Sequence, residues 1–146
     1  MTAAVIIKRA VEAELSMCLR IRHEVFVEEQ QVPAELELDE HDATALHFIV
    51  LDGARPVATA RVLLKNEGRT AKIGRVAVLK HARGAGIGKF LMQSLEKMPD
   101  LWCVSTFVLE AQTHALAFYE RLGYRPHGDE FMDAGIPHFH MKKTVA

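Results

Sequence analysis

A strand pattern, a basic glycine-rich loop and an amphipathic helix pattern follow one another directly in residues 73–98. Ile73–Leu79 is a β-type run, and the basic loop comes immediately after it. The next residues place one face of a helix at i, i+3, i+4, i+7, i+8 and i+11, namely Ile87, Phe90, Leu91, Ser94, Leu95 and Met98. This order predicts a strand whose end meets the start of a helix at a glycine-rich turn.

The loop has the composition of an anion site. Gly84, Gly86 and Gly88 let the backbone approach a ligand closely, because glycine has no Cβ atom. The first N–H groups of the following helix have no intrahelical partner, and the helix dipole adds partial positive charge there. Such a terminus commonly binds phosphate. Basic side chains accompany it, at Lys80, His81, Arg83 and Lys89. The segment therefore predicts a site for a phosphorylated ligand.

Two familiar phosphate-binding patterns do not fit this loop. A nucleotide-binding P-loop requires G-x-x-x-x-G-K-[ST]. Here the glycine–lysine pair at 88–89 is followed by Phe90, and Arg83 stands at the first glycine position. The dinucleotide pattern G-x-G-x-x-G begins at Gly84 but reaches a lysine where the third glycine should be. The sequence excludes both nucleotide patterns.

The pattern that remains is R-x-x-G-x-G, filled by Arg83, Gly86 and Gly88. It resembles the pyrophosphate loop of the GNAT superfamily of N-acetyltransferases, which cradles coenzyme A. The resemblance implies that the coenzyme contacts the preceding strand end, the loop and the helix start, namely Val76, Ala77, Val78, Arg83, Gly84, Ala85, Gly86, Ile87, Gly88 and Lys89. The loop by itself leaves one alternative open, a glycine-rich turn that binds no ligand.

A second segment, residues 112–124, carries the same resemblance. The spacing from Tyr119 to Gly123 and Tyr124 is similar to the second GNAT signature, in which the tyrosine lies near the sulfur of the coenzyme. The resemblance implies that Tyr119 is the general acid that protonates the departing thiolate. Gln112 stands where many family members carry an asparagine that binds coenzyme A, which implies a cofactor-binding role for it. The alternative for Tyr119 is a half-buried core residue.

Further segments at both ends of the chain resemble the ElaA-like branch of this superfamily. They are Arg20–Gln30, followed by Asp39, Glu40, Asp42 and His47, and the C-terminal Ala134–Met141. Because the resemblance covers nearly the whole chain, it implies a single GNAT domain over residues 1–146. The cofactor it implies is acetyl-CoA as co-substrate, and the partner is a primary amine of a small molecule or peptide. A homodimer is a further expectation from the family, whereas the branch defines no particular acceptor.

The order of elements agrees with that family. We expect strands at Val5–Lys8, Ala45–Leu51, Val57–Lys65, Ala71–Leu79, Val104–Glu110, Tyr124–His127 and His138–Lys143. Helices are expected at Glu12–Glu28, Gly86–Met98 and Thr113–Leu122, the last capped by Thr113 and ended at Gly123, with a helical turn near Pro33. The predicted fold is α/β (α+β): a mixed, mostly antiparallel sheet of about six to seven strands, flanked by about four helices. The resemblance adds that its central strands are splayed.

Composition excludes several other classes. The formal net charge of the 146 residues is −1, which does not indicate a nucleic-acid partner. The apolar piece Ala3–Ile7 is far too short for a signal segment or membrane span, so no membrane partner is expected. Cys18 and Cys103 show no framework spacing and are expected to be free thiols in a reducing cytoplasm. The acidic run Asp39–Asp42 is either a solvated loop or a selector of cationic amines.

Acetyl transfer to an amine requires a neutral nucleophile, although a free alkyl amine has a pKa near 10. We expect Tyr119 as general acid, and Glu110 or Glu28 as the carboxylate that accepts the amine proton, directly or through water. Glu28, Glu29 and His138 are the expected substrate-binding residues. For each glutamate the alternative is a solvated surface side chain, and for His138 it is an ordinary hydrogen-bonded histidine.

Eight histidines also raise the question of a metal. His138 and His140 alternate along one strand and would face the same side, and His41 and His47 lie on or near the acidic loop. Neither C-x-x-C nor H-E-x-x-H occurs, so no metal is expected. Two functional alternatives stay open: a GNAT-fold sensor that binds acyl-CoA without turnover, and an enzyme that uses longer acyl donors.

Overall fold

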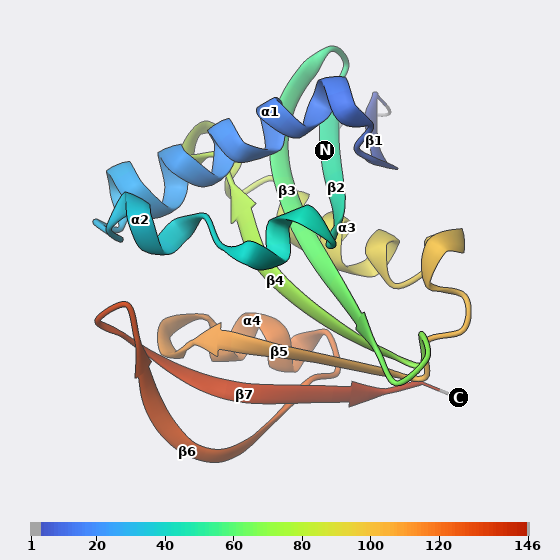
Figure 1. Cartoon of the computed structure of the whole chain (residues 1–146), viewed down its shortest axis with the longest axis vertical. Helices are drawn as coiled ribbons and strands as arrows, with labels where there is room; N and C mark the ends of the chain where they lie inside the picture. The colour runs from blue at the N-terminus through green and yellow to red at the C-terminus, as the bar shows by residue number, and fades with distance from the viewer. Residues whose placement is uncertain (1–3, 146) are drawn as a thin grey trace.

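The computed structural model describes residues 4–145 and contains a seven-stranded sheet with the order β1-β2-β3-β4-β5-β7-β6 (Figure 1). The strands are β1 Val5–Arg9, β2 Leu46–Asp52, β3 Arg55–Lys65, β4 Thr70–Val78, β5 Thr106–Gln112, β6 Arg125–Asp133 and β7 Ile136–Thr144. All neighbouring pairs are antiparallel except β4 with β5, which run parallel. The mixed, mostly antiparallel sheet expected from the sequence is confirmed.

Helices cover both faces of this sheet. They are α1 Glu12–Arg22, the π-helix η1 His23–Glu29, α2 Ala34–Glu37, α3 Ile87–Leu95 and α4 Leu116–Arg121, with short 3₁₀ turns η2 Glu40–Ala43, η3 Lys80–Ala82, η4 Pro99–Leu101 and η5 Thr113–Ala115. In Figure 1, α1 and α2 lie in front of β2–β4, whereas α3 and α4 lie behind the sheet. Within residues 4–145, no helix is long and apolar enough to cross a membrane.

The apolar face of α3 supplies much of the core beneath the sheet. Leu91, Met92 and Leu95 have no exposed surface, and Ile87 at the first turn is also buried. They pack in one cluster with β-strand residues such as Phe48. The buried stripe matches the helical spacing in the sequence, although α3 ends at Leu95 rather than Met98.

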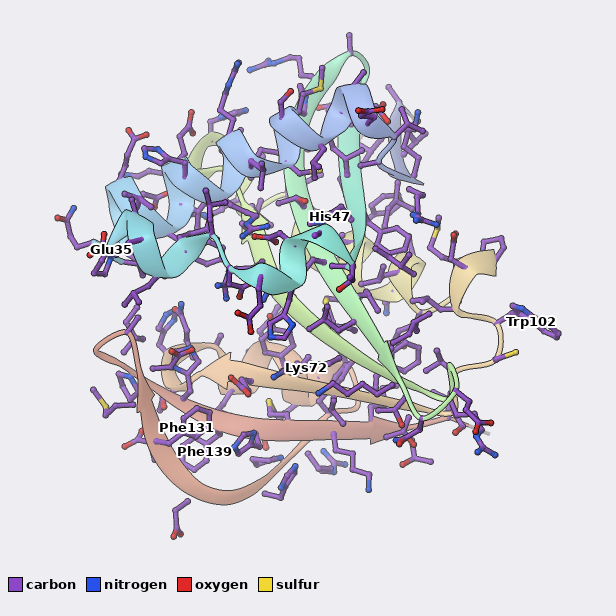
Figure 2. All side chains as sticks on the ribbon, viewed as in Figure 1. Glu35, His47, Lys72, Trp102, Phe131 and Phe139 are labelled. Atoms are coloured by element: carbon purple, nitrogen blue, oxygen red, sulfur yellow. The ribbon has the colours of Figure 1, made fainter. Side chains whose placement is uncertain are left out.

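The two central strands separate. β4 and β5 pair only from Thr70 with Thr106 to Ile73 with Leu109. Just inside the parting point, Lys72 Nζ lies 3.1 Å from Glu110 Oε1, and Lys72 is labelled at this position in Figure 2. Past it, the β3–β4 register shifts at a bulge where Arg75 adopts a φ of +50°. A bulge bends its strand and increases the local twist, and the splayed central strands are thereby confirmed.

Three local expectations need correction. The first helix is not one α-helix to residue 28, because it widens into a π-helix from His23; apolar spacing does not report such a change of hydrogen-bond register. Thr113 does not cap α4: the cap is Ala115, and the Thr113 hydroxyl donates to Glu130 on β6 at 2.8 Å. The last two strands are longer than predicted, and β6 continues past His127 because a bulge between His127 and Phe131 absorbs a polar, glycine-containing stretch.

Candidate active site

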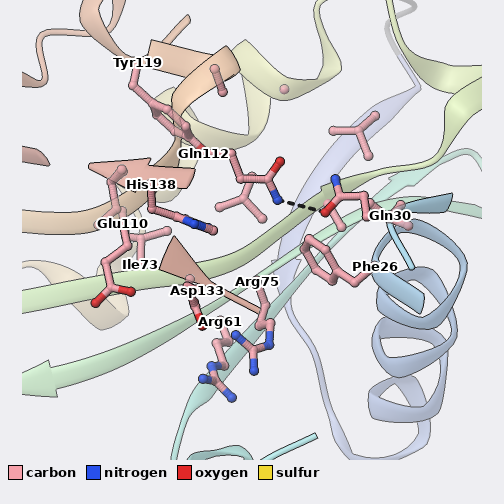
Figure 3. A pocket seen from close by; sticks show the side chains of 18 of the residues that line it. Phe26, Gln30, Arg61, Ile73, Arg75, Glu110, Gln112, Tyr119, Asp133 and His138 are labelled. Carbon is pink, nitrogen blue, oxygen red and sulfur yellow. Dashed lines mark hydrogen bonds between the residues drawn. The ribbon is translucent and has the colours of Figure 1, made fainter. Parts of the chain in front are cut away.

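A groove of about 1070 Å³ opens where β4 and β5 separate (Figure 3). Its walls come from η1, α2, β4, β5 and β7, together with the start of α3 and the body of α4. Of the residues expected from the sequence, thirteen line it: Val76, Ala77, Val78, Arg83, Gly84, Gly86, Ile87, Gly88, Lys89, Glu110, Gln112, Tyr119 and His138. Ala85, Glu28 and Glu29 do not. The fold therefore brings two distant sequence signatures to one cavity.

The glycine-rich loop forms one end of this groove. Gly84 and Gly86 have φ values of +83° and +82°, a region that residues with a Cβ rarely adopt. Gly86 is also the N-cap of α3, and the first helical bond runs from Phe90 N–H to its carbonyl at 2.9 Å. The N–H groups of residues 87–89, in the first turn of α3, thus have no intrahelical acceptor. This arrangement can bind an anion such as a pyrophosphate.

Arg83 ties the loop to the end of the first helical segment. Its Nε donates to the Val78 carbonyl at 3.0 Å, and its two terminal nitrogens donate to the Glu29 carboxylate at 2.9 and 2.7 Å. These hydrogen bonds from Arg83 lower the pKa of Glu29. Glu29, which was expected at the acceptor side, therefore lies on the loop side. Its neighbour Glu28 is exposed, with Oε2 at 3.1 Å from His23 Nδ1.

Tyr119 lies on α4 with its ring almost wholly buried, at 9% exposure. The ring packs edge-on against Phe118 and Tyr124, with centroid separations of 5.0 and 6.0 Å. Burial raises the pKa of Tyr119 to about 12, because an apolar environment disfavours the phenolate. The hydroxyl therefore stays protonated at neutral pH. No described residue hydrogen-bonds to it, so it is free to donate to a ligand in the groove.

Gln112 closes the groove between β5 and η1. Its Nε2 donates to Gln30 Oε1 at 2.8 Å (Figure 3). Its Oε1 lies 2.6 Å from His114 Nε2. Two strand positions earlier, Glu110 contacts Lys72, and His140 Nδ1 lies 4.0 Å from the same carboxylate. The side chains of Glu110 and Gln112 point to the same face of β5, as those of residues two apart on a strand must. That face is the floor of the groove.

The acidic run joins a network of buried ion pairs that the sequence reading missed. Arg22, only 1% exposed, donates to Glu37 Oε2 through Nε at 2.9 Å and Nη2 at 2.7 Å, and to Asp42 Oδ1 through Nη1 at 2.7 Å. Arg61 donates to Asp39 at 2.7 and 2.8 Å and to Asp42 at 2.9 Å. Three arginines and three carboxylates share the cluster once Arg75 is included.

The network shifts the ionisation of its carboxylates. Hydrogen bonds from Arg61 lower the pKa of Asp39. Burial alone would raise the pKa of Asp42, but hydrogen bonds from Arg22, the Asp39 N–H and Arg61 outweigh it and hold this pKa far below its usual range. Asp39 and Asp42 are thus neither solvated nor free negative charges, whereas Glu40 between them is exposed. In the sequence, the one signal for this network was Arg22, a charged residue on the inward face of the first helix.

Arg75 links this network to the coenzyme side of the groove. Its Nε donates to Glu37 Oε2 at 2.9 Å, and its Nη2 donates to the Glu37 carbonyl at 2.9 Å. The same residue occupies the bulge with positive φ, directly before Val76. The ion pairs therefore help to hold a backbone conformation that costs energy in a non-glycine residue.

Across residues 4–145, no group of three or more His, Cys, Asp or Glu could hold a metal ion.

Three features meet at one groove: a splayed parallel strand pair, a glycine-rich helix start and a buried tyrosine. Together they are typical of acyltransferases that use coenzyme A. Residues 7–145 match the family "Acetyltransferase (GNAT) domain", so the chain belongs to the GNAT superfamily. It lies in the ElaA-like branch of that superfamily, as the sequence resemblance implied.

Relatives cover almost the full chain. The uncharacterized N-acetyltransferase YjcF of Bacillus subtilis is 45% identical over 133 residues, which is 90% of this chain and 94% of YjcF. Protein ElaA of Escherichia coli is 33% identical over 91% of this chain and 89% of ElaA, and its crystal structure has a TM-score of 0.80, covering 95% and 97% of the two chains. An acyl-CoA N-acyltransferase from Pseudomonas aeruginosa has a TM-score of 0.81 at 32% identity, covering 96% and 98%.

Proposed function

We propose that this acyltransferase moves the acetyl group of acetyl-CoA to a primary amine of a small molecule or peptide by direct attack. The observation that carries the proposal is the single groove that joins the Gly84–Lys89 loop to Tyr119. The P. aeruginosa relative is named as an acyl-CoA enzyme, which supports the same donor chemistry.

In this proposal the donor lies along the end of β4. The pyrophosphate takes the free N–H groups at the start of α3 and the side chains of Arg83 and Lys89. Within residues 4–145, no strand pairs with the edge of β4 that faces β5 beyond Ile73. Main-chain donors of Val76, Ala77 and Val78 are therefore proposed to bind the pantetheine arm and the thioester carbonyl. Such donors are oriented before reaction, which favours stabilisation of developing negative charge on oxygen.

Tyr119 is proposed as the general acid. Because its pKa is raised to about 12 by burial, its proton is present throughout the neutral range. A coenzyme A thiol resembles cysteine, whose pKa is about 8.5, so the hydroxyl assists the departing sulfur by donating a hydrogen bond as charge develops there. A positioned acid of this kind contributes about 10²–10⁴-fold in rate.

Carboxylates are proposed to act on the acceptor side. Glu110 lines the groove and either holds the cationic amine by its charge or accepts its proton, directly or through water. Glu28 is proposed as an outer charge at the end of η1 that attracts such an amine, whereas Glu29 is held by Arg83 on the side of the coenzyme loop. We also propose that the protein works in the cytoplasm, because Cys18 and Cys103 are both free thiols.

Thiol release separates this function from the sensor alternative. Wild-type protein is incubated with acetyl-CoA and a panel of spermidine, glucosamine, lysine and short peptides with a free N-terminus. The proposal expects thiol release that depends on at least one amine. Stabilisation of the fold by acetyl-CoA, worth about 2.7 kcal/mol at a hundredfold excess over Kd, together with no release on any amine, supports the sensor instead.

A further inference from the structure

His138 is held in one tautomer by its own strand. Its Nδ1 lies 2.7 Å from the carbonyl oxygen of Ile136. A carbonyl oxygen can only accept a hydrogen bond, so Nδ1 must carry the proton. In the neutral ring, Nε2 is then left with a free lone pair, because the hydrogen bond at one ring nitrogen decides the state of the other. The fold thus presents this imidazole as a proton acceptor through Nε2.

That nitrogen is accessible from the groove. His138 is only 8% exposed, yet it lines the cavity. Among the described residues, the one fully buried side-chain nitrogen or oxygen without a partner is Nδ1 of His47. Nε2 of His138 has no hydrogen-bond partner among residues 4–145 and is not one of these fully buried atoms. It is therefore accessible from the cavity. Figure 3 shows the imidazole projecting into the pocket near Gln112 and Glu110.

Neighbouring strands keep the ring in place. His138 on β7 lies directly opposite Gln112 on β5 and opposite Phe131 on β6. The Phe131 ring stacks on the imidazole, with centroids 5.8 Å apart and planes 26° from parallel. A side chain fixed by both packing and a hydrogen bond meets the geometric demand on an acid–base group. His138 is therefore preorganised within the groove that also contains Tyr119.

The carboxylates are less well placed for proton transfer. The Glu110 Oε1 atom lies 3.1 Å from Lys72 Nζ, so this carboxylate already neutralises a cation. Glu28 lies outside the residues that line the groove, and its Oε2 contacts His23. The charge of Glu110 is thus already paired with Lys72 and Glu28 lies outside the groove, whereas the imidazole of His138 lies inside it with Nε2 free of any cationic partner.

We infer that His138, through Nε2, is the general base that deprotonates the acceptor amine; this rests on the acetyl transfer proposed above. His138 takes one proton from the acceptor ammonium, which frees the nitrogen lone pair. The lone pair forms the C–N bond, and the C–S bond breaks with its electron pair on sulfur. Tyr119 protonates the sulfur, the second amine proton restores the tyrosine through water, and His138 releases its proton to solvent. The products are the amide, the free thiol and one proton.

The test compares wild type with His138→Asn. The asparagine amide can still donate to the Ile136 carbonyl from near the Nδ1 position, but it offers no basic nitrogen. Other ionisable groups line the same groove, namely Glu37, Asp39, His41, Arg61, Lys65, Lys72, Arg75, Arg83, Lys89, Glu110, His114, Tyr119 and Asp133. For this reason the pH profile is interpreted as the difference between two proteins that differ at His138 alone. His127→Asn, on the exposed strand β6, is the matched control.

The kinetics are measured by thiol release with the best acceptor of the amine panel. We expect kcat to fall about 10²–10⁴-fold in His138→Asn at neutral pH, with an unchanged Kd for acetyl-CoA. The deficit should shrink as pH rises toward the amine pKa near 10, where the acceptor is already neutral. A deficit that is equal at every pH, or an unchanged kcat, overturns the base assignment.

Two further outcomes keep the inference separate from folding and from the proposed function. Ring-nitrogen NMR of the wild-type protein should show His138 protonated at Nδ1 alone in its neutral form, and a neutral ring protonated at Nε2 overturns the inference even if the variant does not fold. Absence of thiol release by the wild type with every amine removes the proposed function, and the base assignment falls with it. Release by the wild type that is undiminished in His138→Asn removes the base assignment alone.

Discussion

Glu37→Gln is expected to destabilise the fold far more than its position in a four-residue helix suggests. Glu37 is 4% exposed and its Oε2 accepts from Arg22 at 2.9 and 2.7 Å and from Arg75 at 2.9 Å. The glutamine keeps the shape and one acceptor oxygen but removes the charge. The buried cluster, with three arginines and three carboxylates, then carries one uncompensated positive charge.

The size of the effect follows from the burial of Arg22. Removal of one partner from a buried ion pair costs about 3–5 kcal/mol, because the remaining charge is left desolvated. Asp42 still contacts Arg22 in the variant, so we expect the lower end, about 3 kcal/mol. At an m-value of about 2 kcal/mol/M, the urea midpoint should fall by about 1.5 M.

Urea unfolding followed by circular dichroism at neutral pH measures this change. Glu35→Gln is the control, because Glu35 lies on the same helix but is exposed (Figure 2); its effect should stay within about 0.5 kcal/mol. A loss below about 1 kcal/mol in Glu37→Gln, with an unchanged m-value, would refute the view that this network is a tightly coupled, buried element of the fold.

Three further outcomes follow from the site. Tyr119→Phe should lower kcat about 10²–10⁴-fold with little change in acetyl-CoA affinity by calorimetry, and an unchanged kcat would remove the hydroxyl from the mechanism. Gly86→Val, at a φ of +82°, should abolish the thermal stabilisation by acetyl-CoA; a shift equal to that of the wild type would contradict the loop assignment. The free energy of unfolding should decline as pH falls below about 4, since Asp39 and Asp42 have lowered pKa values when folded and titrate near 3.9 when unfolded. Asp42→Asn should flatten that decline in urea titrations between pH 2.5 and 7, and an identical slope would argue against it.

The parts that could be predicted from sequence have local causes. Glycines 84 and 86 mark positions of positive φ, and Gly123, at a φ of +98°, ends α4 as its position after the apolar face predicted. The apolar spacing of α3 likewise identified its buried face. Each of these features is decided by a residue and its near neighbours in the chain, which is why one sequence was sufficient.

The parts that could not be predicted depend on pairing across the fold. Glu37 meets Arg75 only because α2 packs beside the bulge of β4, 38 positions away in the chain. Arg83 meets Glu29 across 54 positions, which moved Glu29 from the expected acceptor side to the coenzyme loop. The free Nε2 of His138 depends on a backbone hydrogen bond and on a groove formed by strands distant in sequence, so a histidine in the sequence alone does not indicate its role.

The proposed reaction of this GNAT protein is the transfer of an acetyl group to an amine nitrogen. Mass spectrometry of the amine panel, recovered after incubation with acetyl-CoA and either wild type or Tyr119→Phe, tests it most directly. We expect an N-acetylated product that forms with the wild type and is strongly reduced with the variant. Acetyl-CoA that binds tightly but leaves every amine unmodified would contradict it.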